Sequence, residues 1–186
     1  MKTLVRTLLW AVAAATLIQF VRTPTTAPPT RSGEMSMRMV SSELTELLES
    51  PESRAVMFTE QEVNEYLQQA LRVKAEGWMP GVKFERAYVL FEPSVCNIGL
   101  EQSVWGYPIY SGVRYNVGVA DGNFFAVCSG GNFGRMPIDP RLMKYADVAF
   151  KRLWTALQRE RDQMNKMQAV QPEKGRITLV TKAAQP

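Results

Sequence analysis

The chain of 186 residues contains no histidine and only two cysteines. Histidine is the commonest general base and the commonest metal ligand in proteins, so the usual residue for both roles is absent. Zinc sites are built mainly from cysteine and histidine, and two cysteines alone do not make one. We therefore expect a protein that is not an enzyme, with no catalytic residue, no metal and no cofactor.

The two cysteines, Cys96 and Cys128, are also too few for the disulfide framework of small secreted domains. They can form one bridge if the strands that carry them are neighbours in a sheet. Two free, buried thiols are the alternative, and the sequence leaves the choice open.

A phosphate-binding loop is not expected, although Gly130, Gly131 and Gly134 lie between a predicted strand and a predicted helix. The cluster does not follow the Gly-x-Gly-x-x-Gly pattern, and it lacks the Gly-Lys-Ser/Thr ending of a P-loop. Pro137 and Pro140 also separate it from the helix N-terminus that would hold the phosphate. We interpret the cluster as a bulge or turn.

The folded part of the chain carries no excess of either charge. The whole chain has 22 Lys and Arg against 18 Asp and Glu, which gives a net charge of +4. The cations that precede the first acidic residue, Glu34, are Lys2, Arg6, Arg22 and Arg31. The remaining residues therefore hold 18 charges of each sign, so the composition does not favour nucleic acid as a partner.

What the N-terminus does contain is a largely apolar segment. Thr3–Val21 is about 19 residues long, enough to span a hydrocarbon core. We interpret residues 1–22 as an uncleaved transmembrane anchor, with a cleaved signal peptide ending near Ala13–Ala15 as the alternative. Residues 23–40 are predicted to be a Pro/Thr/Met-rich linker. The expected location is a membrane, with the folded part facing the periplasm or the exterior.

Residues 41–186 are predicted to form one α+β domain. Apolar periodicity and turn residues predict helices over 42–48, from residue 59 onward and over 141–167, and strands over 82–92, 98–105, 109–120, 123–129 and 176–181. Short turns between the strands indicate an antiparallel meander. We expect a curved antiparallel sheet of about four to six strands, with the long C-terminal helix and a shorter N-terminal helix packed on one face.

The start of the second helix is the clearest local signal. Thr59 and Glu62 have the spacing of a capping box, in which each side chain bonds the backbone of the other residue. Phe58 precedes the cap and is expected to pack against Val63 as a hydrophobic staple. The next apolar residues recur at helical spacing and form one face.

Aromatic residues and methionine are abundant, and both faces of the predicted strands around 82–91 and 124–127 are apolar. A ligand groove between helices and sheet would explain this surplus, because methionine and aromatic side chains adapt to irregular ligands. The alternative is a well-filled core. The predicted ligand-binding residues are Tyr66, Leu67, Tyr88, Leu90, Tyr115, Phe150 and Trp154.

A second hypothesis needs no small ligand. The chain would then be an accessory or assembly protein that docks a membrane-protein partner. The contact surface would be either the aromatic segment Trp105–Tyr110 or the charged side of the predicted helix 141–167. Arg86 and Arg114 lie on strands among apolar residues, and we interpret both as partly exposed sheet arginines rather than as sites for an anionic head group.

Two segments resemble a known family. Val56–Leu67 is similar to the FTE-x-E-[VI]-N-x-Y-L helix start of small bacterial envelope proteins, which include lipoprotein-type domains of the tubular lipid-binding-like (TULIP-like) group. Gly131–Ile138, with the sequence GNFGRMPI, resembles their G-x-[IF]-G-x-[LM]-P-[LI] passage. The resemblance implies a helix-on-curved-sheet domain with a hydrophobic ligand groove and no catalysis. This chain lacks a lipobox cysteine, so no lipid anchor is implied.

Overall fold

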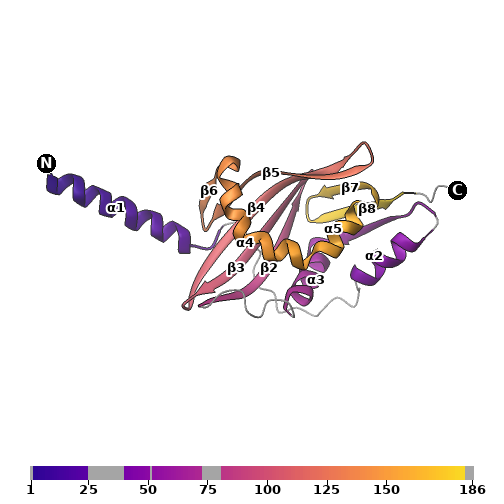
Figure 1. Ribbon diagram of the computed structural model, residues 1–186, viewed down its shortest axis with the longest axis horizontal. Coiled ribbons are helices and arrows are strands. Elements are labelled where there is room, and N and C mark those ends of the chain that lie inside the picture. The colour runs from indigo at the N-terminus through magenta and orange to yellow at the C-terminus, as the bar shows by residue number, and fades with distance from the viewer. Residues whose placement is uncertain (1, 25–39, 51, 73–80, 183–186) are drawn as a thin grey trace.

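The computed structural model describes residues 2–24, 40–50, 52–72 and 81–182, and it contains two antiparallel sheets (Figure 1). The large sheet has five strands in chain order, β2 (Val82–Glu92), β3 (Val95–Val104), β4 (Tyr107–Ala120), β5 (Asn123–Phe133) and β6 (Met136–Ile138). The small sheet has three strands in the order β1 (Ala55–Thr59), β8 (Arg176–Thr181) and β7 (Met167–Glu173). The helices are α1 (Lys2–Val21), α2 (Val40–Glu49), α3 (Glu60–Arg72), α4 (Met143–Ala156) and α5 (Gln158–Met164), and a short 3₁₀ turn, η1 (Pro140–Leu142), precedes α4.

Two-residue turns connect successive strands of the large sheet. Asp121 and Gly122 both have positive φ, 52° and 73°, and join β4 to β5. Trp105 and Gly106 do the same between β3 and β4, with φ of 50° and 85°. Such turns match the right-handed twist of the flanking strands. The short turn predicted between strands 109–120 and 123–129 is therefore confirmed.

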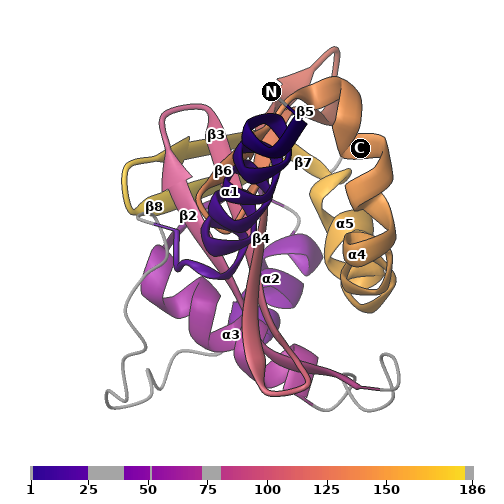
Figure 2. The ribbon, with the colours of Figure 1, turned by 90° about the vertical axis from the view of Figure 1, so that its left-hand side faces the viewer.

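Helices cover one face of each sheet. α3 and α4 pack on one face of the large sheet, which we call the inner face, and their core includes Leu67, Phe91, Leu100, Phe150 and Leu153. α2 packs on the small sheet in a second cluster. Figure 1 shows α4 and α5 in front of the strands, with α1 projecting from the body at one end, and Figure 2 shows α4 and α5 beside the strands.

The start of α3 confirms the predicted capping box. The Thr59 backbone N–H donates to the Glu62 carboxylate at 2.7 Å, and the Glu62 N–H donates to the Thr59 hydroxyl at 3.3 Å. Phe58 is 1% exposed and shares a cluster with Val63, as the staple predicts.

Two side chains of α3 pair with the free edge of β2. Asn64 accepts from the Val89 N–H at 2.6 Å and donates to the Val89 carbonyl at 2.9 Å. Glu60, one turn earlier, accepts from the Phe91 N–H at 3.0 Å. An unpaired strand edge exposes backbone groups that need partners. Glu60 and Asn64 therefore have a structural role here.

The predicted fold class needs correction. A single curved sheet with a long C-terminal helix is wrong: the structure has two sheets, and no long C-terminal helix is present among the described residues. The predicted helix 141–167 is divided at Leu157, where φ is −102° and ψ is 21°. Leu157 stays in the core while α5 turns away, and Met167 is a fully buried residue of β7 instead of a helix end. Strands β1 and β7, which make the small sheet possible, were not predicted from the sequence.

The transmembrane, signal-anchor interpretation of residues 1–22 is also wrong. None of the described helices is long and apolar enough to cross a membrane. The segment at the end of α1 instead contacts the large sheet: the Arg135 N–H donates to the Gln19 carbonyl at 3.0 Å, and its guanidinium donates to the Thr23 carbonyl at 2.9 Å. Of the predicted linker 23–40, residues 25–39 lie outside the described residues, and Val40 is a buried residue of α2.

The sheet order decides the question of the cysteines. Cys96 on β3 and Cys128 on β5 both lie opposite Tyr115 of β4, so one strand separates them. Two strand spacings amount to about 9.5 Å, whereas a disulfide needs Cα atoms within about 7 Å. Both cysteines are accordingly free thiols.

Candidate functional site

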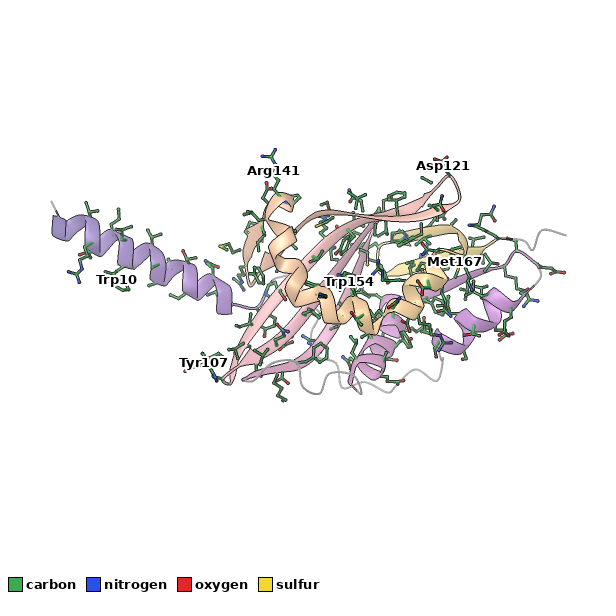
Figure 3. The ribbon with its side chains drawn as sticks, in the orientation of Figure 1. Trp10, Tyr107, Asp121, Arg141, Trp154 and Met167 are labelled. Carbon is green, nitrogen blue, oxygen red and sulfur yellow. The ribbon has the colours of Figure 1, made fainter. Side chains whose placement is uncertain are left out.

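A groove of about 290 Å³ lies between the inner face of the large sheet and the end of the helix layer. Its walls are mainly apolar. The strands contribute Cys96, Ile98, Tyr115, Val117, Phe124 and Ala126, and the helices and the residue between them contribute Trp154, Leu157, Glu160, Arg161 and Met164. Figure 3 shows Trp154 in the helix layer that covers the strands.

Strand alternation explains why these side chains meet. Residues two apart on a strand share a face, so Tyr115 and Val117 of β4 both face the helices. Val117 lies opposite Ala126 of β5, and Tyr115 lies opposite Cys96 of β3. A bulge between Arg114 and Tyr115 resets the register of β4 with β5 just before this segment. Tyr115 and Val117, the β4 residues that line the groove, directly follow this bulge.

Trp154 is the aromatic centre of the groove. Its ring meets the Tyr115 ring edge-on, with centroids 5.6 Å apart and an interplanar angle of 77°. It also stacks with the Phe150 ring, with centroids 6.5 Å apart and an interplanar angle of 29°. The Arg161 guanidinium lies 5.9 Å from the Trp154 ring centroid, within the range of a cation–π contact. Contacts from both helices and from the sheet thus fix the position of this ring.

One carboxylate stands among these apolar side chains. The Tyr66 hydroxyl of α3 donates to Oε1 of Glu160, which links the two helices α3 and α5. The second carboxylate oxygen, Oε2, is buried and has no hydrogen-bond partner within the described part of the chain. Burial, together with the hydrogen bond to Glu160, raises the pKa of Tyr66 above its ordinary value, so the phenol remains the donor.

Cys96 lines the groove, and its thiol is not a nucleophile. Burial raises the pKa of its thiol to about 12, with a smaller contribution from the negative charge of Glu60. The thiolate is the reactive form of cysteine, so this thiol stays neutral and unreactive near neutral pH. Within the described ranges, no cluster of three or more His, Cys, Asp or Glu side chains could hold a metal. The arrangement is suited to binding an apolar group.

A polar cleft of about 810 Å³ adjoins the groove and opens to solvent. The two spaces share four lining residues, Phe124, Ala126, Trp154 and Arg161. The cleft adds polar and charged side chains that the groove does not have: Lys151, Thr155, Gln158, Asp162 and Asn165. A molecule with an apolar part and a polar part could therefore occupy both spaces.

The structure places the seven predicted binding residues in three different environments. Tyr115 and Trp154 line the groove, and Tyr66 reaches it through Glu160. Leu67 and Phe150 belong to the closed core beside it, where Phe150 is completely buried.

Tyr88 and Leu90 alternate with the core residues of β2 and so point to the opposite face of the large sheet. The Tyr88 ring lies over Gly99, where an added Cβ would be 2.1 Å from it. Beside it the Arg86 guanidinium donates to Glu101 at 2.6 Å and stands 5.5 Å from the Tyr88 ring centroid. Around Tyr88 these side chains cover this face. The Arg86 side chain is only 13% exposed, so it is more buried than the partly exposed sheet arginine that the sequence predicts.

Several groove residues were not predicted, although some carried a signal. Phe124 and Ala126 alternate on one face of a strand with apolar residues on both sides, and Met164 lies on the apolar stripe of the predicted long helix. Glu160 and Arg161 carried no signal, because they stand in a run of charged residues that reads as a solvent-facing helix side. Both lie on α5, which begins after the irregular residue Leu157.

No protein-family model matches this chain, and no curated protein matches its sequence significantly. The features that bear on function are therefore the apolar groove and the polar cleft that adjoins it.

Proposed function

We propose that this protein binds a small hydrophobic, lipid-like ligand in the groove between the large sheet and helices α4 and α5, without catalysis. The observation that carries the proposal is the apolar groove itself, which the Trp154–Tyr115 contact holds in shape. The groove is open, although the same face of the sheet is filled by side chains only one or two helical turns away.

The size of the groove limits the ligand. At about 290 Å³ it is at the lower end of the volumes that bind drug-sized molecules. It suits one alkyl chain or a small ring system better than a whole phospholipid. Burial of each methylene contributes about 0.8 kcal/mol, which is about fourfold in affinity. Affinity within a series of alkyl ligands should therefore rise about fourfold per methylene and then level off when the groove is full.

Two neighbouring residues of β5 provide a matched test. Ala126 lines the groove, whereas Val127 points to the other face and is 58% exposed. Ala126→Trp should fill the groove and abolish uptake of a fluorescent alkyl probe with an uncharged hydroxyl head group, and Val127→Trp should leave uptake unchanged. Native mass spectrometry of protein purified without detergent should show a bound apolar molecule in the parent chain only. A ligand-free spectrum together with no uptake by the parent chain would refute the proposal.

A second function, docking of a protein partner at a membrane, is favoured by a different observation. Trp105 and Tyr107 at the β3–β4 turn are 84% and 70% exposed. Trp105 has a left-handed backbone conformation, which a bulky residue seldom adopts, and its indole lies against Gly81. An exposed tryptophan in an unfavourable backbone conformation favours a role in contacting a partner. Tyr110, in contrast, is buried, so the contact surface would be the turn and not the whole segment Trp105–Tyr110.

Affinity purification from membranes separates the two functions. A stoichiometric membrane-protein partner that is lost in Trp105→Asn, and retained in Ala126→Trp, would support docking. A partner retained in both variants would exclude the turn as the contact surface. The expected position at the periplasmic or exterior side of a membrane stays a prediction.

A further inference from the structure

We propose that the ligand is an amphiphile whose head group donates a hydrogen bond, such as an alkyl alcohol or alkyl ammonium, and that Glu160 accepts it. This inference rests on the proposed binding function of the groove and adds the chemical class of the head group.

The argument begins with the two oxygens of the Glu160 carboxylate. Oε1 accepts from the Tyr66 hydroxyl, while Oε2 is buried and has no partner within the described part of the chain. A buried polar atom that lacks a hydrogen bond is costly, and more so when it carries charge. The last torsion of a glutamate side chain is soft, so a small rotation turns Oε2 toward a donor in the groove. A ligand with an O–H or N–H group would remove this penalty on binding.

The cations near the groove do not reverse this preference. Arg159, whose charge acts on Tyr66, is exposed and donates to the Thr45 hydroxyl at 3.3 Å. Arg161 is exposed and lies against the face of Trp154, at the boundary of groove and cleft. Lys151 is exposed and lines only the cleft, where exposed Asp162 stands as an opposite charge. Exposed charges are screened by water and salt, whereas the half-buried Glu160 carboxylate, whose Oε2 is out of contact with solvent, is screened less. A ligand carboxylate placed beside Glu160 would therefore be repelled.

The adjoining spaces suit the two halves of an amphiphile. The alkyl chain would lie along the apolar wall that the strands provide, near Ile98 and Val117. The head group would then stand beside Glu160, and any larger polar part would extend past Trp154 into the cleft.

The test uses three probes with the same chain, octylamine, 1-octanol and octanoate, at neutral pH and below their micelle-forming concentrations. Isothermal titration calorimetry of the full chain should show octylamine and octanol binding at least about tenfold more tightly than octanoate, since hydrogen bonds to charged groups are the strong ones. Glu160→Gln places an amide near Oε2 and keeps an oxygen for Tyr66, so this preference should disappear or reverse. Tyr66→Phe removes the other donor of the carboxylate, so the preference should increase.

Asp162→Asn is the matched control, because it removes the same charge two residues away from a side chain that lines only the cleft. It should leave the preference unchanged. An equal effect of Asp162→Asn and Glu160→Gln would show that net charge alone sets the preference and would overturn the inference. Octanoate binding as tightly as the other probes would also overturn it and leave the proposed function intact. No binding of any probe would refute both.

Discussion

The inner face of the large sheet is closed at one end of the helix layer and open at the other. At the closed end Phe150 and Leu153 of α4 are completely buried against α3 and the sheet. At the open end, after the turn at Leu157, α5 leaves the groove above Tyr115 and Ala126. The same sheet face and neighbouring turns of helix thus give a core in one place and a binding space in the other. The difference between the two ends coincides with the break between α4 and α5 at Leu157.

The largest expected effect tests the closed end. Phe150→Ala removes a fully buried ring and should lower the free energy of unfolding by about 3–5 kcal/mol. Trp154→Ala at the open end should cost clearly less, because the ring there is only partly buried and its removal widens an existing space. Urea unfolding followed by circular dichroism measures both. Equal losses in the two variants would mean that the two ends are packed alike and that the contrast is wrong.

Asn64 holds α3 on the closed end and should have the next largest effect. Asn64→Ala leaves both backbone groups of Val89 without their partners, so the free energy of unfolding should fall by about 2–3 kcal/mol. Gln68→Ala, one turn further along α3 and exposed, is the control and should change stability little. Amide hydrogen exchange at Val89 adds a local measurement, since its protection should fall in Asn64→Ala alone.

Tyr66, which lies between the two ends, should make the free energy of unfolding depend on pH in the alkaline range. The pKa of Tyr66 is raised in the folded chain, first by burial and then by Glu160, whereas an unfolded chain ionises tyrosine near its ordinary value of about 10. Above that pH the unfolded state loses a proton that the folded state keeps, so stability falls as the pH rises. Below pH 10 the contribution is fully present. Tyr66→Phe should therefore flatten the alkaline part of a plot of unfolding free energy against pH, and parallel curves would contradict the buried hydrogen bond.

How far the sequence predicted these features depends on how local each one is. The capping box at Thr59, the turn at Asp121 and strand β2 are specified by neighbouring residues, and the structure has them where the sequence places them. The small sheet depends on pairing of β1 with β8, which lie more than 100 residues apart in the chain, so no local pattern announces it. The turn of the helix at Leu157 has no proline or glycine to mark it.

The candidate site shows the same limit at the level of single residues. Tyr115 and Trp154 were predicted because aromatic side chains on apolar faces are visible in a sequence. Tyr88 lies on the face opposite the groove, which the sequence did not reveal, since both faces of β2 are apolar and alternation alone does not say which face the helices cover. A β-bulge between Phe84 and Arg86 makes the face of each β2 residue still harder to predict, because it changes which residues of β2 share a face.

The smallest expected effect concerns a region outside both ends, the β3–β4 turn. Trp105→Asn puts Asn-Gly, the preferred pair for such a turn, where the backbone already has positive φ at both positions. Because the Trp105 side chain is 84% exposed, little burial is lost, and stability should be unchanged or rise by about 1 kcal/mol. Thermal unfolding measures this, and probe uptake by the groove should remain that of the parent chain. A stability loss above about 1 kcal/mol would mean that the indole contact with Gly81 supports the fold, and the exposed tryptophan would then no longer favour a docking surface.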